Sequence, residues 1–252
     1  MNTAVRFAAI ALATLMLGAC ASQSPAPQFD SDPHEAARLN AQLGAQYLRS
    51  DRLQLAKSKL DKALRQDPDN ADAHAIHGLL SMRLDEPSAA RDHFETALDL
   101  RPGDPQILNN YGTFLCGEGD HEAGVERFLE AAENPLYQTP AYAYANAGRC
   151  ARQAGDIDAA RAHLRHALDL DGRMATALFD LTLLELDRGR PARAREYIDR
   201  YHEVATPAPE SLWLAIRVER ARGDDRRANE YGKRLVRNFP DSRQADRFLE
   251  TR

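Results

Sequence analysis

The sequence predicts an all-helical protein that is built as a right-handed superhelix of paired helices. Small, large and helix-ending residues recur with a period of 34 residues, most clearly over Ala71–Asp104. Aromatic residues make up only 7% of the chain, and its high alanine content favours helices over strands. Polar turn residues, such as Gly119-Asp120 and Gly155-Asp156, return at one shared position of the period. Because turns and period agree, we expect repeated helix-turn-helix units.

The residues of the Ala71–Asp104 window indicate how each unit packs. Gly78, Ala90 and Ala97 are small enough to let two helices approach closely, and Phe94 fills the space between them. Pro102 ends the second helix, because proline lacks the backbone N–H and restricts the residue before it. This arrangement resembles the tetratricopeptide repeat, which implies a superhelix whose stacked helix pairs each contact mainly their neighbours.

The period extends over most of the chain. We expect six repeats, at 37–70, 71–104, 105–140, 141–174, 175–208 and 209–242. The third repeat is longer because the proline-containing segment 134–140 forms an extended loop, where Leu136 and Tyr137 are either exposed or packed on neighbouring helices. The sequence therefore predicts one continuous solenoid with a single break in its register.

The C-terminal end departs from the pattern. In the sixth repeat Ile216 stands at the usually small position and Gly232 at the usually large one. Residues 243–252 are expected to form a capping helix, with Phe248 and Leu249 covering the last repeat, because the terminal units of a solenoid need a cap.

The N-terminus has the features of an export signal. Within residues 1–19, Arg6 supplies a positive charge and an apolar run follows that is too short to span a bilayer. The segment Leu17-Gly18-Ala19-Cys20 resembles the lipobox of bacterial lipoproteins, which implies cleavage before Cys20 and lipidation of its sulfur. The alternative is an ordinary signal peptide that happens to end near a cysteine.

The residues after Cys20 bear on location. The lipoprotein resemblance implies that an aspartate there would favour inner-membrane retention, and Ala21 and Ser22 stand there instead. We therefore expect an anchor in the outer membrane, on its periplasmic face. Residues 20–36 are rich in Ser, Pro and Ala, and we expect the lipidated cysteine and a flexible tether there.

Composition and motifs argue against several functional classes. The net charge is −5, with acidic and basic residues well mixed, so the chain lacks the basic stripe of a nucleic-acid-binding protein. His74 with His77, and His163 with His166, share helix faces but lack further ligands at metal-binding spacing. Hydrolase and phosphate-binding motifs are absent from the sequence. We therefore expect no enzymatic activity, no cofactor, no metal and no small-molecule substrate.

Cys116 and Cys150 are candidates for a disulfide bond. They stand on the first helices of consecutive repeats, and export would place them in an oxidising compartment. Neighbouring helix axes lie about 8–10 Å apart, so cysteines that face each other can reach bonding geometry. The two-residue insertion rotates one relative to the other, and the alternative is two buried thiols that act as small core residues.

The first helix of each repeat is expected to line the concave face, where a protein partner would bind. In the first two repeats these positions form an apolar groove suited to an amphipathic helix or an extended peptide. The groove residues are Ala41, Ala45, Leu48, Leu79 and Met82, with Arg49 and Arg83 at the rim. Farther along, the candidates become polar or aromatic: Asn109, Asn110, Thr113, Tyr142, Asn146, Arg149, Arg152, Trp213 and Arg217. The alternatives are that curvature buries the apolar set and that Trp213 belongs to the core.

Three segments depart from the repeat consensus: NNYGTFLC (109–116), NPLYQTPAYAYANAGRC (134–150) and PESLWLAIRVERARGD (209–224). Together with the lipobox and six repeats, they resemble the type IV pilus biogenesis lipoprotein family (PilF/PilW-type), the pilotin of the pilus secretin. Arg149 departs from the apolar residue that the resemblance implies before the cysteine. The resemblance implies an outer-membrane lipoprotein that binds the secretin and promotes its localisation and multimerisation, and so supports pilus assembly and twitching motility.

A second function uses the same features. A periplasmic lipoprotein scaffold for outer-membrane protein assembly or for cell-wall enzymes would share the lipobox and the repeats, but it should lack the three segments. In the preferred hypothesis, the groove of the first two repeats captures a secretin segment, and the lipid anchor concentrates the subunits at the membrane.

Overall fold

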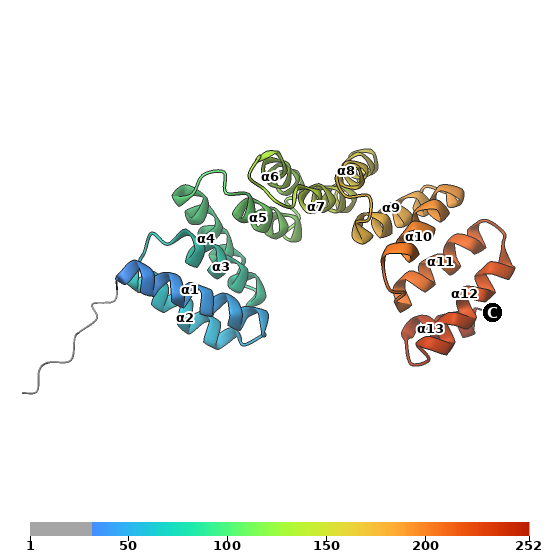
Figure 1. Cartoon of the computed structure of the whole chain (residues 1–252), viewed down its shortest axis with the longest axis horizontal. Coiled ribbons are helices and arrows are strands. Elements are labelled where there is room, and N and C mark those ends of the chain that lie inside the picture. Colours follow the sequence, from blue (N-terminus) through green and yellow to red (C-terminus); the bar gives the residue numbers. More distant parts are fainter. Residues whose placement is uncertain (1–31, 252) are drawn as a thin grey trace, which may run out of the picture.

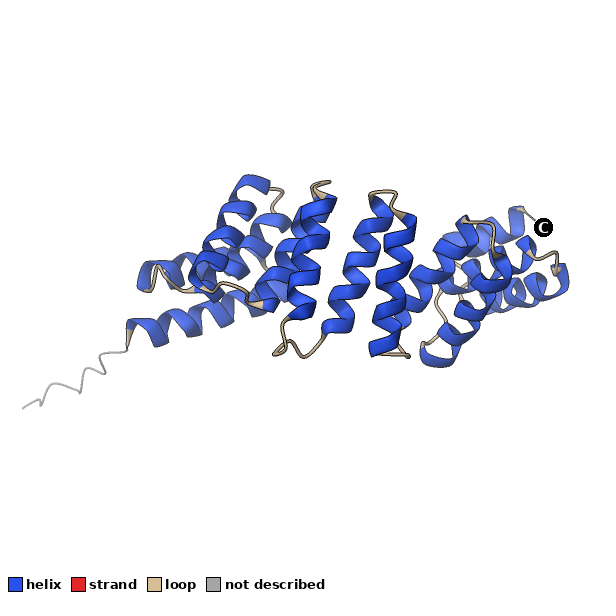
Figure 2. Cartoon of the chain, turned by 90° about the horizontal axis from the view of Figure 1, so that it is seen from above, coloured by secondary structure: helices blue, strands red, loops and turns tan. Residues whose placement is uncertain are grey.

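The computed structural model describes residues 32–251, and helices are the only regular secondary structure in that range. Consecutive helices pair, and the pairs stack side by side into an arch whose two ends face the same way (Figure 1). The same row of pairs is seen from above in Figure 2. The prediction of an all-helical tetratricopeptide superhelix is confirmed. The helices are α1 (Pro33–Arg49), α2 (Leu53–Gln66), α3 (Ala71–Arg83), α4 (Pro87–Leu100), α5 (Pro105–Gly117), α6 (His121–Glu133), α7 (Pro140–Gln153), α8 (Ile157–Leu170), α9 (Ala175–Asp187), α10 (Pro191–Val204), α11 (Pro209–Ala221), α12 (Asp225–Asn238) and α13 (Arg243–Glu250).

Helix α1 begins at Pro33, so the last residues of the expected tether are helical. The Asp32 side chain accepts a hydrogen bond of 3.0 Å from the His34 backbone N–H. Proline suits the first helical position, because its fixed φ is helical and its missing N–H would be unpaired there anyway. The predicted export signal, Cys20 and the tether up to residue 31 lie outside the described residues.

Within the first four repeats, a glycine of the first helix contacts a large side chain of the second. A Cβ on Gly78 would lie 3.0 Å from the ring of Phe94, which is fully buried. A Cβ on Gly148 would lie 2.7 Å from Leu164 and 3.0 Å from the Ala160 carbonyl oxygen. Because interiors are close-packed, these contacts set the distance between the two helices of a pair.

The sixth repeat exchanges the two sizes. Ile216 is fully buried at the position where the first four repeats carry glycine. Gly232 faces the ring of Phe248 from α13, and a Cβ on Gly232 would overlap that ring. Phe248 and Ala245 of α13 are buried in the core of the last repeat, whereas Leu249, which was also expected to cover it, is 52% exposed. The capping helix therefore supplies the large side chain that α12 lacks.

The turn inside each pair places one residue in the left-handed region of backbone conformation. Four repeats carry glycine there, with Gly119 at φ 86° as an example. The first two repeats carry Asp51 at φ 58° and Asp85 at φ 59°. Glycine adopts this conformation freely, whereas it is strained for a residue with a Cβ.

Cys116 of α5 and Cys150 of α7 are bonded as a disulfide, with their Cα atoms 5.8 Å apart. The bond joins consecutive first helices on either side of the longer loop. In that loop Leu136 is 84% exposed, whereas Tyr137 packs against the cluster that contains Leu108. The third and fourth repeats are thus held together across the break in register. No helix within residues 32–251 is long and apolar enough to span a bilayer.

Buried carboxylates add to the apolar packing in the last two repeats. Glu219 of α11 is 1% exposed, and its side chain lies within 4 Å of arginines from α10, from α12 and from the turn between α11 and α12. Glu185 of α9 is equally buried and accepts a hydrogen bond of 2.9 Å from the Arg161 Nε of α8. These ion pairs connect neighbouring repeats, and they account for part of the basic character of the C-terminal segment.

Candidate partner-binding surface

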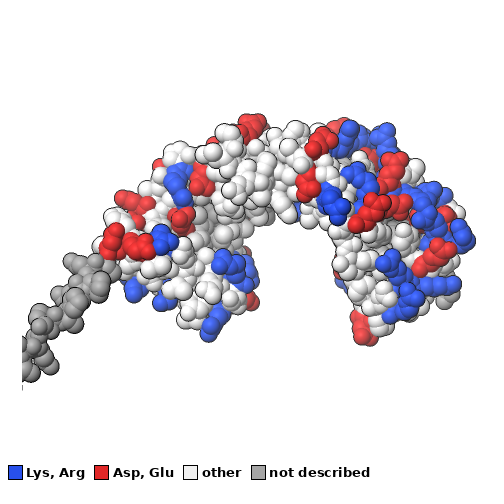
Figure 3. All heavy atoms as spheres, viewed as in Figure 1, with Lys and Arg blue, Asp and Glu red and all other residues white. Residues whose placement is uncertain are grey.

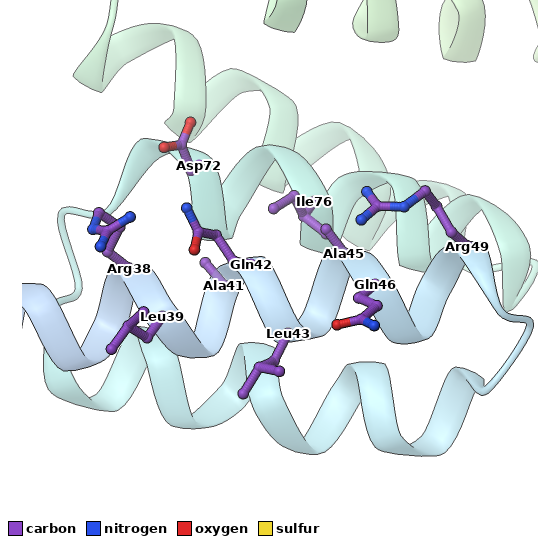
Figure 4. Close-up of a pocket in the computed structure, with 10 residues that line it drawn as sticks. All are labelled: Arg38, Leu39, Ala41, Gln42, Leu43, Ala45, Gln46, Arg49, Asp72 and Ile76. Carbon is purple, nitrogen blue, oxygen red and sulfur yellow. The ribbon is translucent and has the colours of Figure 1, made fainter.

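A groove runs along α1 at the N-terminal end of the solenoid and is bordered by Asp72 and Ile76 of α3. It encloses a cavity of about 630 Å³, and Figure 4 shows its lining. The floor is apolar, and charged or amide side chains stand along its borders. We call this set the N-terminal groove: Arg38, Leu39, Ala41, Gln42, Leu43, Ala45, Gln46, Arg49, Asp72 and Ile76.

The groove exists because α1 carries small residues where it faces α3. Ala41 and Ala45 stand one turn apart on the same side of α1, and Ile76 of α3 lies across from them (Figure 4). Arg38 and Arg49 lie at opposite ends of the row (Figure 4). Arg38 is paired with Glu35 at 2.6 Å, whereas Arg49 has no acidic partner within 4 Å among the described residues. An apolar floor with one cationic end suits an apolar segment that carries an acidic residue or a carboxyl terminus.

The structure places only part of the predicted apolar set in this groove. Ala41 and Ala45 line it, as does Arg49 from the predicted rim. Leu48 does not, because it is only 9% exposed and packs in a cluster with Leu60 and Leu80. Curvature therefore buries Leu48 between helices, which was the alternative to the groove.

Leu79 and Met82 also lie outside the groove. Leu79 is half-buried against the cluster that contains Leu48, and Met82 packs beside Phe114 of the next repeat. Their positions face the neighbouring helix pair more than the solvent. Arg83, predicted at the rim, pairs with Asp51 at 2.7 Å.

Sequence reasoning missed two leucines that line the groove. Leu39 is 47% exposed and Leu43 is 39% exposed, on the side of α1 that faces away from α3. Their spacing of four residues is typical of a buried helix face, so the pattern alone indicates core. The missing signal is their place in the first repeat, where no earlier repeat covers them.

The central part of the concave face is polar and internally linked. Asn146 donates from its side-chain nitrogen to the Asn109 side-chain oxygen at 3.1 Å, so these two amides engage each other. Arg149 pairs with the buried Asp180 of α9 at 3.2 Å. Arg149 thus has an acidic partner in the next repeat, which explains the departure from an apolar residue. Tyr142 is 55% exposed and free to meet a partner.

The remaining predicted residues are dispersed. Asn110 is half-buried on α5. Trp213 packs against the core cluster of the last repeat that contains Leu212 and Ile216, which was the alternative for it. Arg217 lies 3.6 Å from Asp187 of α9. The structure therefore does not bring the candidates of the first, third and sixth repeats into one site.

Three histidines meet at the junction of α2, α3 and α4. The Nδ1 atoms of His74 and His93 are 3.0 Å apart, and His77 stacks on His93 at 4.1 Å between ring centroids. Burial, with the neighbouring His77, His74 and Lys57, lowers the pKa of His93 to about 4. Among the described residues, no group of three or more histidine, cysteine or acidic side chains is arranged to hold a metal ion.

The helix pairs, their glycine-to-large-residue contacts and their left-handed turns define a tetratricopeptide-repeat protein. The tetratricopeptide-repeat family model matches residues 42–105, 77–145, 145–208 and 179–243. At the level of whole chains, the sequence is 30% identical over 247 residues to "Type IV pilus assembly protein PilF" of Pseudomonas aeruginosa, covering 97% of this chain and 98% of that protein. The chain belongs to the PilF/PilW-type family of tetratricopeptide-repeat proteins.

Solved structures agree with this assignment. The structure of P. aeruginosa PilF is similar with a TM-score of 0.75 and 29% identity, covering 87% of this chain and 99% of that one. The structure described as PilW, a widely conserved type IV pilus biogenesis factor, has a TM-score of 0.78 and 28% identity, covering 84% and 98%. The likeness thus spans the whole described solenoid.

Proposed function

We propose that this protein is a non-enzymatic lipoprotein that acts in type IV pilus biogenesis by binding the pilus secretin. The observation that carries the proposal is likeness to PilF and PilW over nearly the whole length of the chain, on a scaffold whose fold presents surfaces for proteins. The lipobox at Leu17–Cys20 supports an anchor in the outer membrane, on the periplasmic side. Binding of the secretin at the periplasmic side of the outer membrane promotes its localisation and multimerisation, and hence pilus assembly and twitching motility.

The N-terminal groove is our candidate for the secretin contact. It combines an apolar floor at Ala41, Ala45 and Ile76 with free space and a cationic end at Arg49. Attachment through Cys20 would hold this groove close to the membrane, because only residues 21–31 separate the anchor from Asp32. Confining both partners to one surface raises their effective concentration, which favours ring assembly without any additional contact.

The test is a substitution that fills the groove without disturbing the core. Ala45→Glu places a carboxylate on the half-buried floor, whereas Leu48→Glu would bury a charge and unfold the repeat. We expect Ala45→Glu to abolish heat-resistant secretin multimers and twitching while lipid labelling and protein level stay unchanged. The matched control is Ala162→Glu, on an exposed position of α8.

The outcome separates the groove from the function. Normal multimers in the Ala45→Glu strain would refute the groove contact. Normal multimers and twitching in a strain that lacks the whole gene would refute the pilus function. A general envelope defect in that strain would favour a scaffold for outer-membrane protein assembly or cell-wall enzymes.

A further inference from the structure

The N-terminal end of the solenoid leaves open a surface that the second repeat covers. In the second repeat Ala73 is fully buried beside Ala63 of α2, and the His77 Nε2 lies 3.1 Å from the Asp61 Oδ1 of α2. One period earlier, the corresponding residues are Leu39 and Leu43. No helix within residues 32–251 covers them, which is why both leucines are exposed.

Helix α2 extends this open surface. Leu55 is 39% exposed, and Lys59 and Lys62 follow it at the spacing that keeps three residues on one helix face. The counterpart of Lys59 in the second repeat is His93, which stacks on the counterpart of Leu43. By this repeat equivalence Lys59 lies beside Leu43. We call the two stripes the end face: Leu39, Leu43 and Gln46 of α1, with Leu55, Lys59 and Lys62 of α2.

The six residues of the end face are apolar, amide or cationic, and the nearest carboxylate on the same stripe of α1 is Glu35, one turn before Leu39, which is paired with Arg38 at 2.6 Å. Lys57, on another side of α2, pairs with Asp61 at 3.4 Å, whereas no acidic group of the described residues lies within 4 Å of the Lys59 or Lys62 side-chain nitrogen. In the space-filling view, the lower edge of the N-terminal end is mostly blue and white (Figure 3). At the opposite end, α13 closes the solenoid with Phe248.

The charge of the end face and its position next to the N-terminal segment indicate which molecule it contacts. A second copy docked end to end would oppose lysines to lysines, which is unfavourable. The chain outside the structure ends where Asp32 begins the described residues, next to the helix that carries Leu39 and Leu43. If Cys20 carries lipid, the intervening residues reach at most about 40 Å when fully extended. Leucines interleaved with unpaired lysines suit an interface of acyl chains and phosphate headgroups.

We propose that the end face lies against an anionic lipid bilayer. This rests on the lipid anchoring contained in the proposed function, but it adds a second contact that the anchor does not require. The contact orients the solenoid with α1 and α2 at the membrane and α11–α13 away from it. Leu39 and Leu43 then form the border between bilayer and groove, and the side lined by Ala45 and Ile76 stays open to a protein partner.

The test measures how close the end face comes to lipid. The full-length chain is placed in phosphatidylglycerol vesicles that contain brominated acyl chains, which quench nearby tryptophan fluorescence. In the variant Leu43→Trp/Trp213→Phe the sole tryptophan is on the end face, and in the unmodified protein it is Trp213 of α11. We expect strong quenching of the tryptophan in the Leu43→Trp/Trp213→Phe variant and little quenching of Trp213 in the unmodified protein. The quenching in the variant should disappear in phosphatidylcholine vesicles or at high salt.

A charge reversal provides the matched comparison. Lys59→Glu/Lys62→Glu in the tryptophan variant should lower the vesicle affinity of the end face at least about 25-fold, since each basic residue near an anionic surface contributes about fivefold and two are removed. The control is Arg226→Glu/Lys233→Glu on exposed positions of α12, with an expected change of less than twofold. Circular dichroism of both variants should keep the helical signal, which checks that they remain folded.

The outcomes distinguish this inference from the proposed function. If the Leu43→Trp variant stays attached to vesicles and its end-face tryptophan is not quenched, the end-face contact is refuted and lipid anchoring stands. If that tryptophan is shielded only when a protein partner is present, and not by lipid alone, the end-face contact with lipid is also refuted. Quenching that persists after Lys59→Glu/Lys62→Glu refutes the contribution of these two lysines to the contact with anionic lipid. If secretin multimers are normal in the Ala45→Glu strain, the groove contact is refuted, and the quenching result for the end face still stands.

Discussion

The first two repeats and the last two are built on the same period but are held together differently. In α1–α4 the pairs pack through glycine against Leu or Phe, as at Gly78 and Phe94, and the end remains open. In α9–α13 buried carboxylates, such as Glu219, bind arginines from neighbouring helices, and α13 closes the end. The superhelix therefore needs only the spacing of small and large residues, and its two ends are free to differ in chemistry.

This difference matters for function because the open end is also the end nearest the proposed anchor. A capped, ion-paired C-terminal end is a stable terminus that needs no partner. An N-terminal end with exposed leucines and a groove beside them retains surface for other molecules. The predictions below test this contrast in the protein itself, starting with the change that should cost most.

Replacing Glu219 should destabilise the C-terminal repeats strongly. In Glu219→Ala, the three arginines that surround the carboxylate lose their buried counter-charge. Breaking a buried pair from one side costs about 3–5 kcal/mol, and the arginines' partial exposure favours the lower figure. The measurement is urea unfolding, with hydrogen exchange to locate the loss in α10–α12. The control Glu230→Ala removes an exposed carboxylate of α12 and should change stability by less than about 0.5 kcal/mol.

Removing the cap should make the C-terminal end resemble the N-terminal one. Phe248→Ala deletes the ring that covers Gly232, and the loss should not exceed about 3 kcal/mol because α13 can detach locally. Hydrogen exchange should accelerate in α11–α13 and remain unchanged in α1–α4. Leu249→Ala, at an exposed position of the same helix, is the control. Equal exchange in both variants would mean that Phe248 does not hold the cap in place.

Mild acid should weaken the histidine junction of the N-terminal repeats. Because the folded pKa of His93 is about 4 and the unfolded value is about 6.5, the unfolded state binds more protons between these values. Stability is therefore fully present above pH 6.5 and falls as the pH drops towards 4. The partial exposure of His93 limits the loss between pH 7 and pH 5 to about 1 kcal/mol. Urea midpoints at both pH values would show it, and His93→Gln should reduce the difference, while His163 and His202, whose pKa values burial also lowers, retain a part of it.

Most of the fold could be predicted from the sequence, because the repeat rests on local chemistry. Glycines at left-handed turns and prolines at helix ends stand within the segment that they shape, so the helix pairs followed from them. Glu185 and Glu219 could not be recognised as buried, since each has an arginine partner on the second helix of the preceding repeat and an acidic residue in a helix usually faces solvent.

The candidate site was predicted less completely, because exposure depends on stacking and not on periodicity. Leu48 and Leu39 are both apolar residues of α1, and the neighbouring helix pair buries only the first. Periodicity assigns both to an apolar stripe and does not say which stripe has a neighbour. The sequence already placed the first repeat at 37–70, so comparing Leu39 and Leu43 with Ala73 and His77 of the second repeat would have identified them as exposed. The depth to which Leu79 and Met82 are buried depends on how closely the neighbouring helix pairs approach, and periodicity does not determine that distance.

The smallest expected effect tests whether the N-terminal turns differ from the others by residue type alone. Asp85→Gly replaces an aspartate at φ 59° with the residue that four other repeats use at this turn. Relief of the left-handed strain exceeds the entropy that glycine adds to the unfolded chain, so we expect stabilisation by about 0.5 kcal/mol. Asp51→Gly should gain less, because it also removes the ion pair with Arg83. A lower urea midpoint for Asp85→Gly would show that the aspartate side chain stabilises this turn more than its backbone conformation costs.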